Sequence, residues 1–468
     1  MTNLMLDSAL NYARQNQAAH LSRLCDWLRI PSISTTPEHA PDVRCAADFA
    51  ANFLRELGMD KVEVRKTTGH PVVYAEHIQP ATANLPTLLI YGHFDVQPAD
   101  PLEAWTRPPF EPTVDGNNLY ARGASDDKGQ AFAILAALES YLKTSGKLPV
   151  NIKVLLEGEE EITSPSLIPY IQQHADELRA DAILIADQDM LDPQHPVVMW
   201  GLRGILYVEI EATGPARDLH SGTFGGGVDN PFNVLVRLLA QLQDSDTRRI
   251  LIPGFYDKVE ELNDKERALI SQAPINDDVG LYLTGAPKLG GEVGYPLAER
   301  VSVRPTFDVH GIAGGFTGEG SKTVIPAKAT AKVSLRLVPH QDPDEVFEAL
   351  TSHLKSICPP TVTLNVRAIG KAVPVKVDYK HPAVQAAAKA YELGFGYKPI
   401  YLRGGGSLPI VHDMIDVLSK PNEEIPVVMI GFGLPDDGTH SPNEKFHLPN
   451  FYHGIETVIH YLDLFSHV

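Results

Sequence analysis

Histidine and carboxylate residues follow an apolar segment in the first quarter of the sequence. His93 and Asp95 come just after the run TLLIY and lie two positions apart, so an extended strand would place both on one side. In that arrangement His93 could bind a metal ion while the Asp95 carboxylate accepts the other imidazole N–H and fixes the tautomer. The same spacing also suits a surface pair at the end of a strand.

Two later segments carry more carboxylates. Asp126 and Asp127 precede an alanine-rich helical segment in RGASDDKG, where they could be metal ligands or helix caps favoured by the helix dipole. The segment EGEEE, residues 157–161, places four glutamates in five positions after the apolar run NIKVLL. Such crowding beside a buried sheet is unfavourable unless cations neutralise it, whereas in an exposed loop it would be a solvated charge run.

Asp187 and His440 add one candidate ligand each. Asp187 ends the apolar run DAILIAD and His440 lies in DGTHS, and either residue alone is more often structural. Together, two histidines and several carboxylates could hold two metal ions that share one carboxylate. Such a pair polarises a carbonyl group and lowers the pKa of a trapped water, which yields a hydroxide nucleophile near neutral pH, and a carboxylate nearby can serve as general base.

Alternating strand and helix patterns predict an α/β fold with a mostly parallel sheet and helices on both faces. Apolar runs at 87–96, 151–158 and 181–187 are typical of strands buried on both faces, and helical patterns separate them at 131–143 and 166–178. Most candidate ligands follow such strands, at the carboxyl ends where open α/β sheets bind their ligands.

The chain is expected to hold a catalytic domain interrupted by a second domain. After GLRG, the run ILYVEIEATG alternates apolar and polar residues, as in a strand with one solvated face. Residues 205–378 are therefore expected to form an inserted α+β domain, which includes an acidic, loop-rich stretch at 244–300. The αβ pattern then returns, so the catalytic domain is expected to comprise residues 1–204 and 379–468.

Net charge, apolar windows and cysteine spacing disfavour nucleic-acid-binding, membrane and secreted proteins. The 468 residues include 40 Lys and Arg against 59 Asp and Glu, and the formal charge of -19 disfavours nucleic-acid and anionic-membrane partners. No apolar window is long enough to span a bilayer, and the N-terminus has helical spacing rather than the pattern of a signal peptide. The three cysteines lack CxxC spacing, so we expect a cytoplasmic protein whose metal site uses histidine and carboxylate, as zinc or manganese sites do.

A series of motifs extends over nearly the whole chain. In order they are GHFDVQPA, RGASDDKG, EGEEE, the AD pair at 186–187, RDLHSG, SLRLVP and GTHSPNEK. They resemble the co-catalytic zinc metallopeptidases, a family that includes carboxypeptidase G, aminoacylase, succinyl-diaminopimelate desuccinylase and the carnosine-type dipeptidases. The branch of cytosolic nonspecific dipeptidase and carnosinase is most similar, through GHFDVQPAD, DDKG, GLRG and RDLHSGTFGG.

The resemblance implies two divalent metal ions per subunit. His93 and Asp187 would bind one ion, Glu161 and His440 would bind the other, and Asp126 would bridge both. Zinc is the expected metal, and manganese and cobalt accept the same ligands.

The resemblance also implies the catalytic residues. Glu160 would be the general base that deprotonates the bridging water, and Asp95 would orient His93. A shift of one position along Glu159–Glu161 would exchange the roles of these glutamates. The family further implies a cis peptide bond after the bridging aspartate, Asp126.

In the family, the inserted domain mediates dimerisation and closes over the active site as a lid. His220 would then reach the active site of the partner subunit and stabilise the oxyanion of the tetrahedral intermediate. Arg336 and the glycine loop with Gly406 and Ser407 would anchor the terminal carboxylate of the substrate. Without the resemblance, His220 fits a structural histidine in a loop, Arg336 fits a surface arginine on a strand, and the glycine loop fits a flexible turn.

The leading hypothesis is a di-metal hydrolase that cleaves dipeptides or short peptides with a free C-terminal carboxylate. The alternative within the family is an N-acyl-amino-acid deacylase of the acetylornithine deacetylase or succinyl-diaminopimelate desuccinylase type, because it uses the same metal chemistry on a different amide. A third hypothesis is a noncatalytic dimer that binds metal or peptide.

Overall fold

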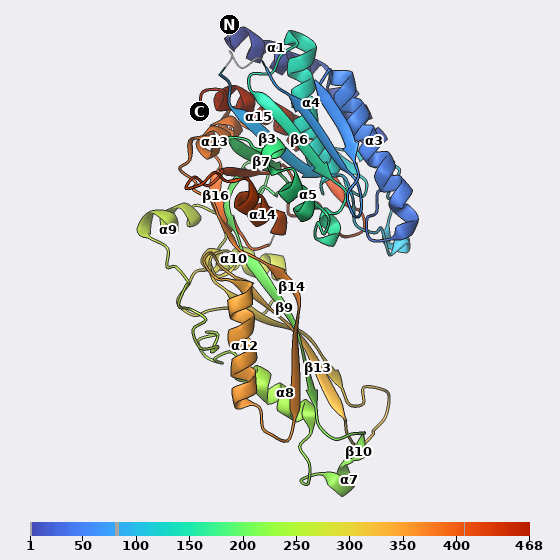
Figure 1. Ribbon diagram of the computed structural model, residues 1–468, viewed down its shortest axis with the longest axis vertical. Coiled ribbons are helices and arrows are strands. Elements are labelled where there is room, and N and C mark those ends of the chain that lie inside the picture. The colour runs from blue at the N-terminus through green and yellow to red at the C-terminus, as the bar shows by residue number, and fades with distance from the viewer. Residues whose placement is uncertain (1, 80–83, 407) are drawn as a thin grey trace. The chain divides into compact units, whose positions relative to one another are not determined.

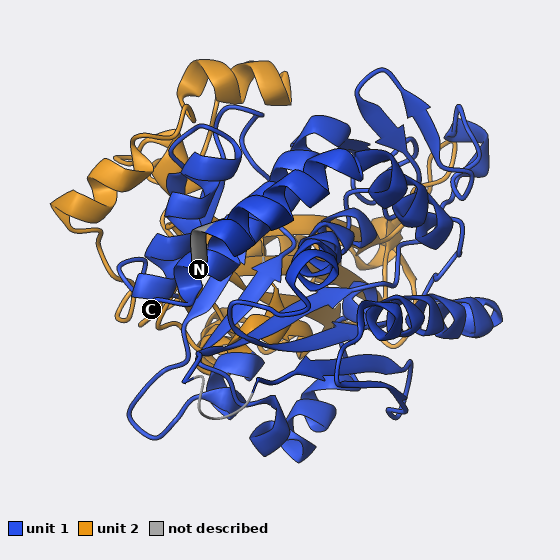
Figure 2. Cartoon of the chain, turned by 90° about the horizontal axis from the view of Figure 1, so that it is seen from above, with its two compact units in different colours: residues 1–200, 377–401, 413–468 blue, residues 201–376, 402–412 orange. Residues whose placement is uncertain are grey.

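The computed structural model describes residues 2–79, 84–406 and 408–468. Contacts within the chain divide it into two compact units, which Figure 2 distinguishes by colour. Unit 1 comprises residues 1–200, 377–401 and 413–468, and unit 2 comprises residues 201–376 and 402–412. Unit 2 thus includes a short late segment that the sequence pattern placed in the last part of the catalytic domain.

The main sheet, which unit 1 mostly builds, is mixed. Its strands lie in the order β1 (Lys61–Arg65), β2 (Val72–His77), β6 (Asn151–Glu157), β3 (Thr87–His93), β7 (Ala182–Ala186), β17 (Val427–Ile430), β8 (Val197–Leu202) and β15 (Val375–Lys376), and β16 (Ile400–Gly404) also pairs with β8. The four central strands, β6, β3, β7 and β17, pair in parallel. β1 pairs antiparallel with β2, β2 with β6, and β8 with β17.

The predicted α/β fold is confirmed, with the parallel pairing confined to the middle of the sheet. The apolar runs expected to form buried strands are β3, β6 and β7, and every residue of β7 is buried. β1 and β2 are antiparallel because the short connection between them is too short for the crossover that parallel neighbours need.

Four helices form a layer on one face of this sheet (Figure 1). They are α3 (Ala40–Leu57), α4 (Lys128–Ser145), α15 (Leu448–Phe465) and α13 (Pro382–Gly394), each in contact with the next. α4 lies on the crossover from β3 to β6, which moves along the sheet toward β2. The crossover from β6 to β7 contains α5 (Leu167–Gln173) and α6 (Ala175–Leu178), and it moves in the opposite direction along the sheet. Since such crossovers are right-handed, α5 and α6 cover the other face.

The remaining elements of unit 1 are short or lie near the N-terminus. They are α1 (Thr2–Gln15), α2 (Gln17–Leu28), the 3-10 helices η1 (Pro37–His39), η3 (Leu102–Ala104) and η4 (Glu160–Ile162), and a small sheet of β18 (Lys445–His447), β5 (Asn118–Tyr120) and β4 (Thr113–Asp115). Where the chain passes between the units it forms β15 (Val375–Lys376), β16 (Ile400–Gly404) and α14 (Pro409–Leu418). Among the described residues, none of the helices combines the length and the apolar character needed to cross a membrane.

Unit 2 is built on an antiparallel sheet of four strands. They lie in the order β11 (Thr306–Gly314), β13 (Lys328–Leu337), β9 (Gly204–Thr213) and β14 (Thr363–Ala372). Burial alternates along β9, as its sequence predicts, and the buried side chains form a core with α8 (Pro231–Ala240) and α12 (Pro343–Ile357). Figure 1 shows both helices beside this sheet.

Short elements fill the rest of unit 2. They are β10 (Leu219–His220), β12 (Val324–Ile325), α7 (Ser221–Phe224), α9 (Asp264–Ile270), α10 (Asp277–Thr284) and α11 (Leu297–Arg300). The acidic stretch 244–300, expected to be rich in loops, thus contains three short helices. Side-chain caps account for two of them: Asn263 and Glu266 form a capping box at α9, and Asn276 caps α10.

Gly129 marks a close approach of backbone in unit 1. A Cβ atom at this position would lie 1.9 Å from the carbonyl oxygen of Ala124 and 2.7 Å from the ring of Phe446. We expect Gly129→Ala to lower the free energy of unfolding by about 1–3 kcal/mol, because overpacking forces neighbouring backbone to shift. Urea unfolding measures this change. Gly290→Ala, whose Cβ would have no neighbour within 4 Å, is the control, and equal stability of both variants would contradict the prediction.

Candidate metal centre

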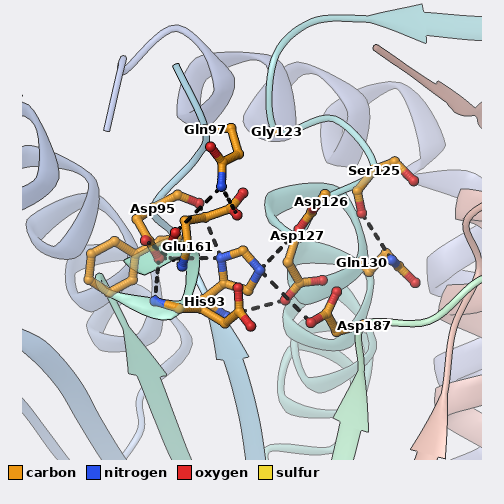
Figure 3. Close-up of polar contacts among 12 residues, drawn as sticks. His93, Asp95, Gln97, Gly123, Ser125, Asp126, Asp127, Gln130, Glu161 and Asp187 are labelled. Atoms are coloured by element: carbon orange, nitrogen blue, oxygen red, sulfur yellow. Dashed lines mark hydrogen bonds and ion pairs between the residues drawn. The ribbon is translucent and has the colours of Figure 1, made fainter. Parts of the chain in front are cut away.

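His93 ends β3 with a fully buried side chain whose two ring nitrogens face different partners (Figure 3). Nδ1 lies 3.1 Å from the Asp95 carbonyl oxygen and 3.3 Å from Asp95 Oδ1, while Nε2 faces Asp126 Oδ1 at 3.1 Å. The Asp95 carboxylate also accepts the backbone N–H groups of Glu160 and Glu161 at 3.2 and 3.1 Å. Asp95 therefore links the end of β3 to the glutamate segment and holds the His93 ring from one side.

Asp126 stands between the two histidines. Its Oδ1 is 3.1 Å from His93 Nε2, and its Oδ2 is 3.0 Å from His440 Nε2. On one side Asp187 Oδ2 lies 4.0 Å from His93 Nε2, and on the other Glu161 Oε2 lies 3.2 Å from His440 Nε2. Among the described residues, the structure thus forms two groups of three ligand atoms, with Asp126 in both.

The donor set fits two divalent ions. The first group is His93, Asp126 and Asp187 and the second is Asp126, Glu161 and His440, and within each group the ligand atoms lie within 4.8 Å of one another. Each group offers one imidazole nitrogen and two carboxylates, which is a ligand set that suits zinc. Three protein ligands leave a coordination position open, as catalytic zinc sites require.

The electrostatics of the cluster are those of a cation site. Burial, together with the neighbouring carboxylates Glu161 and Asp126 and against the effect of His93, raises the pKa of Glu160 to about 7. Hydrogen bonds to Asp126 and Glu161 raise the pKa of His440 to about 10, and burial raises the pKa of Asp187. The protein alone balances this excess of negative charge with protons, which bound metal ions would displace.

The three consecutive glutamates have separate contacts. Glu159 is 4% exposed, and its carboxylate accepts the backbone N–H groups of His70 at 2.7 Å and Ser166 at 3.0 Å. Glu161 Oε2 belongs to the second ligand group and also accepts the side-chain N–H of Gln97 at 2.7 Å. The Glu159 carboxylate is thus held by backbone N–H groups, whereas Glu161 lies in the second ligand group.

Three more residues contact the cluster: Gln97 and Glu444 had no role assigned from the sequence, whereas Asp127, a candidate ligand or cap, is in neither ligand group and makes no side-chain cap hydrogen bond. Gln97 binds Glu161 and lies four positions after His93, and Asp127 Oδ2 accepts the backbone N–H of His93 at 3.2 Å. Glu444 accepts the backbone N–H of Asp126. All three lie in the motifs quoted above, and the peptide bond between Asp126 and Asp127 is cis, as the resemblance implied.

The remaining predicted site residues lie in unit 2. His220 is exposed, and its Nδ1 accepts the backbone N–H of Gly222 at 3.0 Å at the start of α7. Arg336 lies on β13 opposite Ile205, and a Cβ atom on Gly406 would have no neighbour within 4 Å. Ser407 lies outside the described residues.

The model of Peptidase family M20/M25/M40 matches residues 89–464. The chain belongs to this family. It is 33% identical over 483 residues to the Cys-Gly metallodipeptidase dug1 of Schizosaccharomyces pombe, covering 98% of both chains. The crystal structure of an M20 family metallo-carboxypeptidase, Sso-CP2 from Sulfolobus solfataricus, has a TM-score of 0.84 and 35% identity, covering 96% of this chain and 99% of that one. Human carnosine dipeptidase 1 has a TM-score of 0.82 and 29% identity, with 99% of both chains covered.

These likenesses extend over both units of this M20 chain. The predicted family and the predicted fold are confirmed, and relatives that share nearly the full length are metallopeptidases. The catalytic chemistry of the chain is therefore that of a metal-dependent peptide hydrolase.

Proposed function

We propose that this chain is a di-metal dipeptidase that hydrolyses dipeptides or short peptides with a free C-terminal carboxylate. The observation that carries the proposal is the pair of ligand groups that share Asp126, with Glu160 on the same loop as a ligand. Support for the substrate class comes from the dipeptidase names of full-length relatives at 30% identity or more.

In this proposal His93 and Asp187 would hold one ion, Glu161 and His440 would hold the other, and Asp126, which belongs to both groups, would be the shared ligand. Zinc would be the metal, and manganese and cobalt also suit these ligands. Such a pair of ions would supply polarisation of the scissile carbonyl and a lower pKa of the attacking water.

Glu160 is proposed to carry out both proton transfers of the reaction. Glu160 takes the proton from the attacking water and then passes it to the leaving amine. Burial raises the pKa of Glu160 to about 7, close to the value at which a general base works best near neutral pH. Asp95 supports this arrangement, because one carboxylate orients His93 and also receives the backbone N–H of Glu160.

Substrate binding is assigned to unit 2. Arg336, Gly406 and Ser407 would hold the terminal carboxylate, for which a guanidinium fork and glycine backbone N–H groups are suited. The chain would act as a homodimer through this unit, where Val309 and Ile312 on the edge strand β11 are 44% and 40% exposed. A cytoplasmic location agrees with the three free cysteines.

His220 is proposed to act in the partner subunit, which mixing two inactive variants can test. His220→Ala is expected to lower kcat by about 10²–10³-fold, since it removes a donor to the oxyanion. Mixed with Glu160→Gln under conditions that exchange subunits, it should recover about a quarter of wild-type activity, because half of the random dimers carry one intact composite site. A mixture that stays as inactive as its components would contradict action in the partner.

The same ligands also suit two related activities, so a competition assay tests the substrate class. Free-amine dipeptides, N-acetyl amino acids and N-blocked dipeptides are mixed with the protein and Zn²⁺ or Mn²⁺, and all products are followed by mass spectrometry. We expect the free-amine dipeptides to be consumed first. Preferential loss of acyl groups would show the deacylase alternative, which the names of the reported relatives do not favour.

Cleavage of the N-blocked dipeptides would instead point to a carboxypeptidase, the activity named for the Sulfolobus relative. No metal-dependent turnover in any of the three panels would leave only the noncatalytic dimer. Each outcome therefore selects one hypothesis.

A further inference from the structure

Glu444 lies outside the two ligand groups and has an unusual set of partners. Its side chain is 0% exposed, and all four of its N–H donors come from the segment 122–126. Oε2 accepts from Arg122 Nη1 at 2.7 Å and from the backbone N–H of Gly123 at 2.9 Å. Oε1 accepts from the backbone N–H groups of Ser125 at 2.9 Å and Asp126 at 3.2 Å.

These contacts connect the loops that carry two ligands of the second group. Asp126 belongs to the loop that Glu444 binds, whereas His440 precedes Glu444 by four positions in the same turn of chain. The backbone strengthens this link, because the Glu444 carbonyl oxygen accepts the N–H of Ala121 at 3.1 Å and β18 pairs with β5 directly afterwards.

A second carboxylate in the same turn makes a parallel link. Asp437 is also fully buried, and its Oδ2 accepts the Ser125 hydroxyl at 2.9 Å while Oδ1 accepts from Lys445 Nζ at 2.8 Å. The segment 437–445 is thus hydrogen-bonded to the Asp126 loop through two buried carboxylates, one on each side of His440 in the sequence. Burying a carboxylate costs free energy unless it is hydrogen-bonded. The N–H and O–H groups that bind these two carboxylates come from the loops around the ligands, so the same hydrogen bonds order those loops.

We propose that Glu444 is a positioning residue that holds the Asp126 loop against the His440 loop and so pre-forms the second ligand group before metal binds. This inference rests on the proposed function, because it takes Asp126 and His440 as metal ligands. Pre-formed geometry matters there, since partners that orient a ligand typically change metal affinity by about 10–100-fold when they are lost.

Glu444→Gln is the most direct variant. The amide has the same shape, yet one acceptor oxygen becomes an NH₂ group, so in either orientation two of the four N–H donors face another donor. We expect the affinity for the second ion to fall by about 10–100-fold, measured by competition with a chelator, and the visible spectrum of the Co²⁺-loaded protein to change.

The matched control is Glu292→Gln in unit 2. Glu292 is also a buried carboxylate, and it accepts from Arg304 Nε and Nη2 at 2.8 and 2.9 Å and from Arg249 Nη1 at 3.3 Å. Both variants should lower the thermal midpoint, but only Glu444→Gln should change metal affinity and the Co²⁺ spectrum. Wild-type affinity and spectrum in a folded Glu444→Gln protein would overturn the proposal.

Hydrogen exchange of the metal-free wild-type protein provides a second measurement, which decides the question if Glu444→Gln fails to fold. The amides of Gly123, Ser125 and Asp126 should exchange slowly without metal, because Glu444 already binds them. Exchange as fast as in the exposed loop 315–321 would overturn the proposal. A failure of the proposed function would appear separately, as wild-type protein that binds no pair of ions.

Discussion

Glu160→Gln is expected to lower kcat for dipeptide hydrolysis by about 10²–10⁴-fold, the usual contribution of a general acid–base residue. The amide can neither take the proton of the attacking water nor return it to the leaving amine. Since Glu160 is not one of the five residues in the two ligand groups, the variant should bind two Zn²⁺ ions with wild-type affinity. Steady-state kinetics and metal analysis of the same preparation measure both effects.

Glu159→Gln is the matched control, because the same change is made one position earlier. Glu159 is held by the backbone of His70 and Ser166, so its loss should reduce stability while kcat stays near the wild-type value. If Glu159→Gln abolished turnover and Glu160→Gln did not, the glutamate register would be shifted by one and the base would be wrongly assigned.

Asp126→Asn is expected to remove metal binding as well as activity. Asp126 belongs to both ligand groups, with one carboxylate oxygen facing His93 and the other facing His440. Asparagine has a single acceptor oxygen, so it could serve as a ligand on one of these sides but not on both. Since loss of an outer partner costs about 10–100-fold in metal affinity, loss of a shared ligand should cost more than about 100-fold. Isothermal titration with Zn²⁺ gives the affinity and the number of ions bound.

Asp192→Asn is a suitable control for that variant. Asp192 also pairs with a histidine, His195, at 2.7 Å, but it lies outside both ligand groups. Its metal binding should equal that of the wild-type protein. Two tightly bound ions in Asp126→Asn would show that this residue is not the bridge.

The location of the cluster could be predicted from the sequence because its ligands follow strands that are recognisable one by one. β3 and β7 are continuous apolar runs, and parallel strands bring their carboxyl ends to one edge of the sheet, so His93 and Asp187 were expected together. His440 lies in a turn without such a strand pattern, so it was only a candidate ligand from its residue type, and its pairing with Glu161 was implied by the resemblance.

The supporting contacts could not be predicted in this way. The Glu444 side chain meets Gly123 and Ser125 more than 300 positions earlier in the chain, and no local pattern indicates which of many glutamates makes such a contact. The orientation of strands at the edge of the sheet could not be predicted from the apolar pattern either, since β2 begins with an apolar, buried run yet pairs antiparallel with β1 and β6. The short helices in 244–300 depend on single capping residues such as Asn263.

Metal dependence of turnover is the most direct test of a di-metal dipeptidase. The measurement is the rate of hydrolysis of a free-amine dipeptide by metal-depleted protein as Zn²⁺ is added in known ratio to the chain. The rate should be at background without metal and reach its maximum when two ions are bound per chain, as the two ligand groups require. Full activity in the metal-depleted protein, or a maximum at one ion with no further rise, would contradict the account.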